Sequence, residues 1–420
     1  MENLQWAGRE KGDGPLSGLL VVELAHGLAG PFAGTLLADF GADVIKVERP
    51  GKGDVMRQWD YAGGVWWRSI SRGKHTIAID LQNPASRPIV QDLVVKADVV
   101  IESFRPGVLE RLGFGPDVLH AWNPDLHLLR ISGYGQTGPY SQRPGYGKAA
   151  EAFSGLLHMT GFPDGPPVYV GFPIADMTSG LMGAFGVLMA RISSQRGMGR
   201  GQTIDLALYE TVLRVMDFVV PMATGSDIPL MRNGNRQPMD FAPSGVFKTR
   251  DDRWVLYSAA SPEIVRRVLS VVAGEEHARQ DKYQSLSSIR ENANEIEEMV
   301  LHWCAQHTGE QVVQRFTAAH AVAALVQTPD EIVRHPQVLA RESIVDVGHD
   351  GTKYVNVIPM LSETPGRIRS PGSMIVGADA DYVLRDILGY EPSRIESAVE
   401  SGAVFLPNND SVRQRTSAHE

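Results

Sequence analysis

The chain has 420 residues, of which 43% are hydrophobic and 21% are charged, and its formal net charge is −9. This is the composition of an ordinary soluble globular protein, and the acidic balance argues against nucleic acid or an anionic membrane surface as the main partner. The length is enough to bury a large core and is long for one compact domain, so we expect two. Glycine, at 43 residues, exceeds its usual share of about 7%, which predicts many turns and close backbone approaches.

The chain contains a single cysteine, Cys304, so no intrachain disulfide can form, which suggests a reducing compartment. We expect Cys304, in a helical-looking segment, to be a half-buried packing residue rather than a catalytic thiol. The N-terminal segment is polar and lacks the apolar stretch of a secretory signal, and no run approaches the ~18 apolar residues of a membrane span. We therefore expect a cytoplasmic protein without a membrane partner, and we predict no metal site.

The first elements have the pattern of a βαβ unit. We expect a strand at 16–24, a glycine turn at 26–31 with Pro31 at helix position N1, a helix at 32–40 and a second strand at 44–48. This order imitates a dinucleotide-binding fold, because Glu48 ends the second strand about 20 residues after the glycines. The spacing G-x-x-G-P-x-x-G differs from G-x-G-x-x-G, and Lys46 and Arg49 flank the acid, so nicotinamide binding is not favoured.

Strands and helices continue to alternate up to residue 223, as expected for an α/β fold with a parallel sheet. We predict strands at 74–80, 98–102, 126–132 and 202–208, and helices at 84–96, 108–112, 116–122, 149–159 and 209–223. Ser103, Phe104 and Arg105 directly follow the strand at 98–102. Ligands bind at the carboxyl edge of such sheets, so these residues are candidates for a binding site.

The composition changes near Gly225, which we take as the border of a second domain. Residues 226–325 are predicted to form this small α+β domain, while 15–225 and 326–405 form the large domain, with flexible tails at 1–14 and 406–420. In this part of the chain we expect a hairpin at 245–259, helices at 262–273, 292–307, 309–320 and 328–341, a second hairpin at 344–359 and a last helix at 382–388.

Asp176 stands where an apolar, β-leaning run gives way to a helical pattern. Large apolar residues recur behind it at helical spacing, namely Leu181, Phe185, Leu188 and Ile192, and small residues lie among them, namely Gly180, Gly183, Ala184 and Gly186. The pattern predicts Asp176 as a helix N-cap whose carboxylate stays ionised near neutral pH and can act as a nucleophile without a partner base. The simpler interpretation is that Asp176 only caps the helix.

Eight motifs in order along the chain resemble the class III CoA-transferases of formyl-CoA transferase and carnitine CoA-transferase type. They are PLSGLLVVEL…AGP, LADFGADVIKVERPGKGD, ADVVIESFRPGVLERLG, NPDL…ISGYGQTGPY, GLLHMTGFPDGPP, the Asp176 segment, RGMGRGQTIDLAL and LSETPGRIRSPG. The resemblance implies a Rossmann-like large domain built from both ends of the chain, a small inserted domain, and an interlocked dimer.

The resemblance also implies the chemistry. Asp176 matches the family's nucleophile, which attacks the acyl-CoA carbonyl to form an aspartyl anhydride; CoA thiolate then gives an aspartyl-CoA thioester, which an incoming carboxylate attacks. Close-approaching glycine backbone can supply N–H donors to the developing oxyanions, and water has to be excluded because both intermediates hydrolyse.

CoA carries phosphates, so we expect a few well-placed cations rather than a basic protein, and Arg49, Arg105 and Arg111 are the candidates. Each of them is equally readable as a solvated surface arginine. By the family pattern, CoA also contacts Leu28, Ala29, Ile79, Asp80, Leu81, Gln82, Ser103, Phe104, Tyr146 and Gly147. Phe104 is a candidate for stacking near the adenine, and His26 for a hydrogen bond in the same turn.

The chain departs from the family pattern at three positions. Gln82 replaces a common lysine, Leu28 replaces a glutamine of some members, and Gly147 replaces the acidic residue that usually follows the tyrosine. Leu28 suggests a more apolar acyl pocket than oxalate needs. The absence of an acid at Gly147 puts in doubt an acid-assisted step, while the nucleophile remains.

The leading hypothesis is therefore a class III CoA-transferase that acts on an acyl-CoA and a small carboxylic acid, with no permanently bound cofactor. An α-methylacyl-CoA racemase of the same fold needs a base on each face of the α-carbon, and Tyr146 and Gly147 stand where related racemases have His-Asp. A third hypothesis is a non-catalytic subunit of a heteromer. We expect a homodimer, with pairing to a paralogue as the alternative; the donor and acceptor acids stay open.

Overall fold

The computed structural model describes residues 14–59, 62–236, 243–348 and 350–407. The chain divides into two compact units. The first comprises Met1–Ser154, Gly171–Met216 and Ala340–Glu420, and the second comprises Gly155–Val170 and Asp217–Leu339. The predicted tails at 1–14 and 406–420 lie almost entirely outside the described residues.

The limits of the two units differ from the predicted borders at 225 and 325 in a way that backbone contacts explain. Residues 155–170 belong with the second unit because the Gly234 N–H donates to the Gly161 carbonyl at 2.9 Å. The His158 ring also lies 3.2 Å from the Leu230 carbonyl oxygen. Composition alone does not report such contacts between segments that are far apart in the sequence.

The first unit is built on a seven-stranded sheet in the order β12-β3-β2-β1-β4-β5-β6. Its strands are β1 (Leu20–Glu23), β2 (Asp43–Glu48), β3 (Lys74–Ile79), β4 (Val99–Glu102), β5 (His127–Ser132), β6 (Thr203–Ala207) and β12 (Val404–Phe405). All pairs are parallel except β12 with β3. The chain thus forms a mixed α/β fold with a mostly parallel sheet, as the sequence predicted. The strand order reverses between β1 and β4, the position at which ligands bind in open sheets of this kind.

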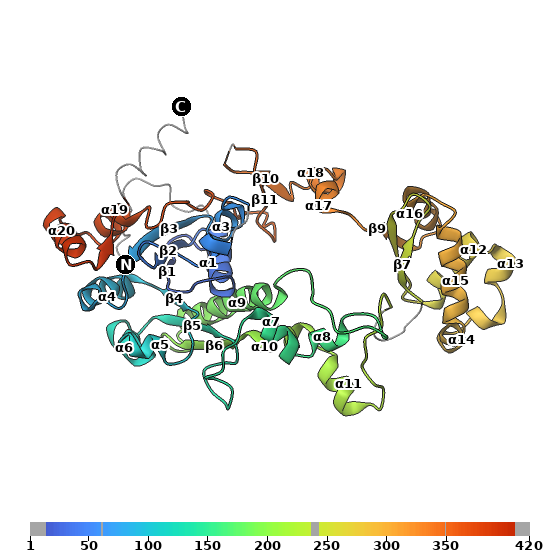
Figure 1. Cartoon of the computed structure of the whole chain (residues 1–420), viewed down its shortest axis with the longest axis horizontal. Helices are drawn as coiled ribbons and strands as arrows, with labels where there is room; N and C mark the ends of the chain where they lie inside the picture. The colour runs from blue at the N-terminus through green and yellow to red at the C-terminus, as the bar shows by residue number, and fades with distance from the viewer. Residues whose placement is uncertain (1–13, 60–61, 237–242, 349, 408–420) are drawn as a thin grey trace. The chain divides into compact units, whose positions relative to one another are not determined.

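Helices cover both faces of this sheet (Figure 1). One face carries α1 (Ala29–Asp39) and α9 (Ile174–Gln195), and the other carries α4 (Arg87–Lys96), α6 (Pro116–Trp122), α19 (Ala380–Tyr382) and α20 (Pro392–Glu400). Alternate residues of β1 point to opposite faces, so Val22 joins the apolar core beneath α4, whereas Glu23 points toward α1. A carboxylate is thereby buried in the layer between the sheet and α1.

Small residues bring α1 and α9 close together. A Cβ added at Gly180 would lie 2.7 Å from Phe32 and 3.0 Å from the Ala29 carbonyl oxygen, and one at Gly183 would lie 2.9 Å from Leu129. The large apolar residues whose spacing indicated the helix are not its core face, because Leu181, Phe185 and Ile192 are 53%, 57% and 41% exposed. The sequence pattern located α9 correctly, and the helix packs on the sheet through its glycines.

The remaining short elements of the first unit connect these layers. They are α2 (Met56–Trp59), α3 (Val65–Ile70), the 3₁₀ turn η1 (Pro84–Ser86), α5 (Val108–Arg111), α7 (Gly147–Phe153), α10 (Leu208–Val215), the β10–β11 hairpin (Ile344–Asp346 and Lys353–Val355) and the π-turn η3 (Val383–Ile387). Within the described residues, no helix combines the length and the apolar character that crossing a membrane requires.

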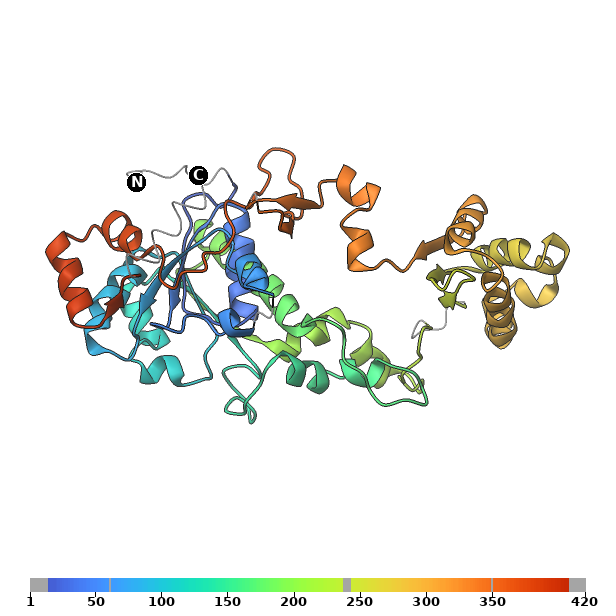
Figure 2. The same ribbon diagram turned by 45° about the horizontal axis from the view of Figure 1, so that its top comes forward.

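The second unit has its own antiparallel sheet, β7-β8-β9, and its own core. The strands are β7 (Gly245–Lys248), β8 (Trp254–Ser258) and β9 (Val322–Leu325); the helical elements are α8 (Leu156–Met159), α11 (Val219–Gly225), α12 (Pro262–Val272), α13 (Glu275–Ala278), η2 (Asp281–Tyr283), α14 (Leu286–Glu291), α15 (Ala293–Cys304), α16 (Gly309–Ala318) and α17 (Pro329–Ile332). Figure 2 shows the helices of residues 262–318, coloured yellow to brown, gathered beside the small sheet. Cys304 is buried in this core, and burial raises its pKa to about 12, which fits a packing role.

Two predicted helices are interrupted by proline. The helix expected at 328–341 is divided into α17 and α18 (Pro336–Ala340), because the residue before a proline disfavours helical backbone. The helix expected at 209–223 is divided into α10 and α11, with a break at 216–218. Pro221 lies in the first turn of α11, where it has no N–H to donate to the carbonyl four residues earlier, so a continuous helix through 217 would lose this hydrogen bond. The helix expected at 149–159 is also divided, into α7 and α8. The elements that were not predicted include the short strands β9 and β12 and the helices α2, α3, α13, α14 and α20.

Candidate active site

Asp176 lies in the first turn of α9 and is not its N-cap. The helix begins at Ile174, and Pro173 occupies the N-cap position without a side-chain capping bond. The prediction of an N-cap was wrong because the N-cap lies three residues earlier, at Pro173, whose fixed φ already suits a helix start, and Ala175 is fully buried on the core face. Asp176 is partly buried.

The surroundings of Asp176 make its carboxyl group less acidic than usual. Burial, followed by the negative charge of Glu151, raises the pKa of Asp176 to about 6, while Lys148 opposes the shift. A group with this pKa is still about nine-tenths ionised at neutral pH. The carboxylate is therefore both charged and more basic than an exposed aspartate, a combination that favours a nucleophile.

Gly147 lies directly beneath this carboxylate. It is the first residue of α7, it is buried, and a Cβ added there would overlap the Oδ2 atom of Asp176. Since even alanine would collide, glycine at 147 is what lets the carboxylate approach the backbone of α7. Tyr146, the N-cap of α7, is 69% exposed.

Two charged residues of α7 complete this part of the site, and the sequence analysis missed both. Glu151 is fully buried, and its Oε2 accepts a 2.8 Å hydrogen bond from the Nζ of Lys148. Lys148 also donates to the Phe172 carbonyl at 3.2 Å, just before α9. The spacing of 147 and 151, one helical turn apart, is the signal that could have pointed to Glu151 once 147 was suspected.

A cavity of about 630 Å³ opens at the carboxyl ends of β1, β2 and β3 and beside the segment after β4. Six predicted binding residues line it, namely Arg49, Ile79, Asp80, Leu81, Gln82 and Phe104. Lys52 and His26 also line it, and the His26 ring lies 5.6 Å from the Phe104 ring. The volume is within the usual range of small-molecule and cofactor sites.

The other predicted residues lie outside the lining of this cavity. Ser103 is hydrogen bonded to the backbone of His26 at 3.0 and 3.2 Å, and Arg105 and Arg111 are exposed. Leu28 is buried in an apolar cluster with Met56, Trp67 and Ile70, against which Met177 packs. Leu28 and Ala29 therefore adjoin the start of α9 rather than the cavity.

The turn at residues 25–31 connects the cavity with α9. His26 lines the cavity, and Ala29, three residues farther on, approaches Gly180, one helical turn after Asp176. A ligand that extends along this turn could reach from the cavity toward Asp176. The conformation of the turn therefore matters to both parts of the site.

Buried charged side chains form hydrogen bonds with two carbonyls and one N–H of this turn. The Nζ of Lys46 donates to the Ala25 carbonyl and to Glu23 Oε1, both at 2.8 Å, and lies 2.7 Å from Asp54 Oδ2. Asp54 in turn accepts from the Gly27 N–H at 3.1 Å. Gly27 has a φ of 78°, a conformation that few other residues adopt.

Lys74 completes the network from the other side. Its Nζ donates to Glu23 Oε2 at 2.8 Å and to the Pro31 carbonyl at 2.6 Å. Burial, together with the charge of Lys46, lowers the pKa of Lys74 to about 8 although Glu23 opposes this. Burial also acts to lower the pKa of Lys46, but the carboxylates of Asp54 and Glu23 outweigh it and raise that pKa. Lys46 is thus the permanent cation of the network.

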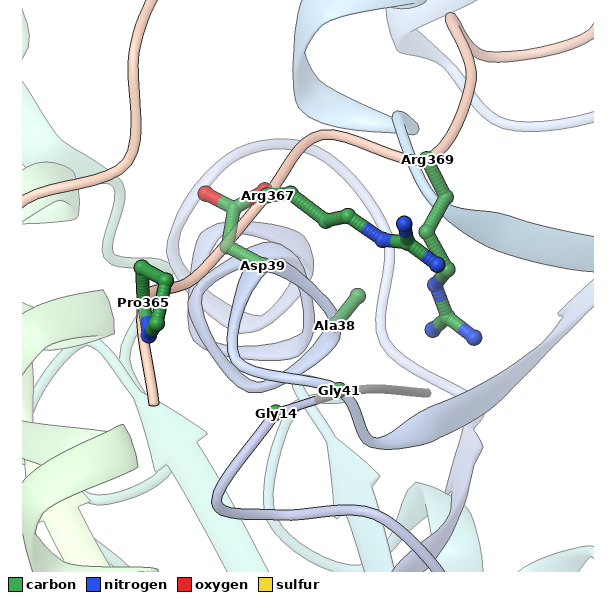
Figure 3. A pocket seen from close by; sticks show the side chains of 7 residues that line it. All are labelled: Gly14, Ala38, Asp39, Gly41, Pro365, Arg367 and Arg369. Carbon is green, nitrogen blue, oxygen red and sulfur yellow. The ribbon is translucent and has the colours of Figure 1, made fainter. Parts of the chain in front are cut away.

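A second hollow, drawn in Figure 3, is far too small for a substrate. Its volume is about 10 Å³, the space of one water molecule, beside the C-terminal end of α1. It is lined by Gly14, Ala38, Asp39, Gly41, Pro365, Arg367 and Arg369. Arg369 donates to Asp43 at 3.1 Å, so this region attaches the C-terminal segment to the sheet.

Comparison with known proteins identifies the class. Residues 16–379 match the family model described as CoA-transferase family III. The chain is 38% identical to a succinyl-CoA–D-citramalate CoA-transferase of Chloroflexus aurantiacus, with 89% of this chain and 94% of that protein covered. It is also 38% identical, with the same coverage, to the beta subunit of a succinyl-CoA–L-malate CoA-transferase of that organism. A crystal structure of a CAIB/BAIF family protein from Brucella suis is similar with a TM-score of 0.78 and 29% identity, over 89% of this chain and 99% of that chain.

Replacing the central cation of the network should destabilise the protein. Lys46→Met leaves Asp54 buried without its partner, so we expect the free energy of unfolding to fall by about 3–5 kcal/mol, as measured by urea denaturation. The matched control is Lys52→Met, at an exposed cavity-lining lysine, which should change stability by about 0.5 kcal/mol or less. Equal denaturation midpoints for the two variants would contradict a stabilising role for Lys46 in the turn.

Proposed function

Since the chain belongs to CoA-transferase family III, we propose that this CoA-transferase passes CoA from an acyl-CoA donor to a free carboxylic acid through covalent intermediates on Asp176. The observation that carries the proposal is the environment of Asp176. This partly buried residue lies in the first turn of α9, its carboxylate contacts Gly147 of α7, and its pKa is raised to about 6. Asp176 is also the residue that the sequence predicts as the nucleophile.

The proposed reaction has four steps, and no proton is gained or lost overall. An oxygen of Asp176 attacks the acyl carbonyl and CoA thiolate leaves, which gives an aspartyl anhydride. The thiolate attacks the aspartyl carbonyl and the first acid departs with the bridging oxygen. The second acid attacks the aspartyl-CoA thioester and releases the thiolate again. The thiolate finally attacks the new acyl group, which regenerates the Asp176 carboxylate.

The electrostatics of the site suit these steps. Both intermediates on Asp176 are uncharged at the aspartyl group, so acylation removes a negative charge from a partly desolvated position. Converting a carboxylate to a neutral group costs less free energy when burial has raised its pKa than when the carboxylate is in water. The missing side chain at Gly147 leaves the space that Oδ2 of Asp176 occupies.

Position 147 also bears on the racemase alternative. A racemase would need a second base on the opposite face of the α-carbon, and Gly147 has no side chain to supply one. The absence of the acid that usually follows the tyrosine is compatible with transfer, because the Asp176 carboxylate occupies the space into which a Cβ at 147 would project.

We assign the cavity of about 630 Å³ to the nucleotide part of CoA. Arg49 and Lys52 provide the cations there for phosphate groups, and Phe104 provides an aromatic face for the adenine. The pantetheine arm then follows the turn at 25–31 toward Asp176. The contacts of CoA with Leu28, Ala29, Ser103, Tyr146 and Gly147 belong to this path, whereas Arg105 and Arg111 are placed less well for it.

We also propose that two chains assemble. The face of α9 that carries Leu181, Phe185, Met189 and Ile192 is apolar and exposed in the single chain, as expected for a surface that a second chain covers. We propose a homodimer, interlocked as in the family, with a large Rossmann-like domain and a small inserted domain. The relatives named as subunits make pairing with a paralogue the alternative.

The proposed nucleophile can be tested by trapping. Succinyl-CoA is the donor named for the relatives with 38% identity, so it is the probe of choice. After incubation with succinyl-CoA and hydroxylamine, we expect an aspartyl hydroxamate at Asp176 in the peptide mass spectrum, because both intermediates are acylating agents.

The matched variants are Asp176→Ala and Asp117→Ala. Asp117 is an exposed aspartate in the first turn of α6, so its replacement should leave transfer unchanged. Asp176→Ala should abolish trapping and lower turnover by a factor of about 10³ or more. Full turnover by Asp176→Ala would refute the proposal.

The three arginine candidates can be separated by kinetics. Arg49→Ala removes a charge-assisted phosphate contact of about 1.5–3 kcal/mol, so the KM for acyl-CoA should rise about 10- to 100-fold. Arg105→Ala and Arg111→Ala, at exposed residues outside the cavity lining, should change KM by about twofold or less. An unchanged KM for Arg49→Ala, with a rise for Arg105→Ala or Arg111→Ala, would show that the cavity does not hold the phosphates.

A further inference from the structure

Glu151 is a buried carboxylate that the proposed reaction does not use. It lies on α7 with no solvent exposure, and one of its oxygens, Oε2, is bound by Lys148 at 2.8 Å. Its other oxygen, Oε1, is buried and has no hydrogen-bond partner within the described part of the chain. A buried carboxyl group with one unsatisfied oxygen is costly, so its presence calls for a role beyond packing.

The geometry of α7 places Glu151 on the same side as the nucleophile. Residues four apart on a helix lie above one another, so Glu151 follows Gly147 on one face. The carboxylate of Asp176 rests on Gly147, where a side chain would collide with Oδ2. Asp176 and Glu151 therefore approach the same strip of α7, one helical turn apart.

Lys148 fixes this arrangement relative to α9. Its Nζ contacts Glu151 and also the Phe172 carbonyl, in the segment that leads into α9. The lysine side chain is 43% exposed, while Glu151 is not exposed at all. The pair thus presents its negative end to the interior and its positive end to the surface.

These two groups are the charges that act on Asp176. Glu151 raises and Lys148 lowers its pKa. The other elements packed on α9 are α1, α10, β5 and β6, and their titratable groups are not among the causes of the shift. These groups are Asp39, His127, Arg130, Asp205, Tyr209, Glu210 and Arg214.

We propose that Glu151, held by Lys148, is a positioning residue that supplies beside Asp176 the negative charge that position 147 lacks. In this role, which rests on the proposed function, the negative charge of Glu151 repels the negative charge of unacylated Asp176. Acylation of Asp176 by the donor neutralises that charge and relieves the repulsion. Glu151 itself gains or loses no bond and no proton; its charge makes Asp176 a stronger base and favours the acylated enzyme.

The simpler interpretation is that Lys148 and Glu151 form a structural ion pair at the start of α7. Surface pairs at this spacing stabilise helices by a few tenths of a kcal/mol. Such a pair would lose the same support whichever partner is replaced. If instead the two charges act on Asp176, its pKa should shift in opposite directions in the two variants, and this difference separates the interpretations.

The test compares Glu151→Gln with Lys148→Met. The measured quantity is the apparent pKa on the acidic side, or acidic limb, of the pH profile of kcat/KM for succinyl-CoA. This profile reports the pKa of the essential groups in the free enzyme. In the wild type we expect this pKa near 6. Glu151→Gln should lower it by about one unit and Lys148→Met should raise it, while Glu151→Asp, which keeps the charge, should retain a limb close to that of the wild type.

A second readout is the yield of the trapped hydroxamate. Glu151→Gln should reduce the steady amount of acylated Asp176 at equal succinyl-CoA, whereas Glu151→Asp should restore it. The role is contradicted if both charge variants leave the acidic limb where it was, or move it in the same direction, while the wild type is still trapped at Asp176. Absence of trapping in the wild type would instead remove the proposed function itself.

Discussion

The close contact between the Asp176 carboxylate and the backbone of Gly147 is the constraint on which the rest of the site depends. With any side chain at 147, the Asp176 carboxylate would have to leave its present position, because a Cβ there would overlap Oδ2. The contact also determines the charge state, because it holds Asp176 in a partly desolvated position next to Glu151. The position and the raised pKa of this carboxyl group thus both depend on the missing Cβ at 147.

The scaffold supports this contact from two directions. Glycines let α9 lie close against α1, which fixes the helix that carries Asp176. On the other side, Lys46 and Lys74 hold the Ala25 and Pro31 carbonyls, so both ends of the turn are tied to Glu23 in the interior. Burying these charged side chains costs desolvation free energy, but it determines the conformation of the turn, because each lysine binds a particular carbonyl.

Much of the fold could be predicted from the sequence because apolar runs and glycine turns report local structure directly. The strands from β1 to β6 and most of the helices between them followed from periodicity, whereas α2 and α3 did not. The face on which α9 packs did not, since its largest apolar residues are exposed and its glycines are buried. A single sequence cannot distinguish an apolar face that meets the sheet from one that meets another chain.

The site was predicted unevenly for a similar reason. Motifs mark the candidates that could be proposed from the sequence, namely Asp176, Arg49, Phe104 and the residues after β3. Lys46, Glu23 and Lys74 were not identified as a cluster, because their pairing requires three strands to lie in the order that the folded sheet gives them. Glu151 was missed because an acidic residue in a short helix has no sequence pattern of its own until the structure places Gly147 beneath the Asp176 carboxylate.

The central claim is that an oxygen atom of Asp176 is exchanged in every turnover, and isotope labelling tests this most directly. The wild-type enzyme is incubated with succinyl-CoA and succinate that carries ¹⁸O in its carboxylates, and the peptide containing Asp176 is then analysed by mass spectrometry. The incoming acid donates its oxygen to the aspartyl group, so Asp176 should acquire ¹⁸O, and only when succinyl-CoA is present. If labelled CoA ester forms while Asp176 keeps its original oxygens, CoA is transferred without passing through this carboxylate, and Asp176 is not the nucleophile.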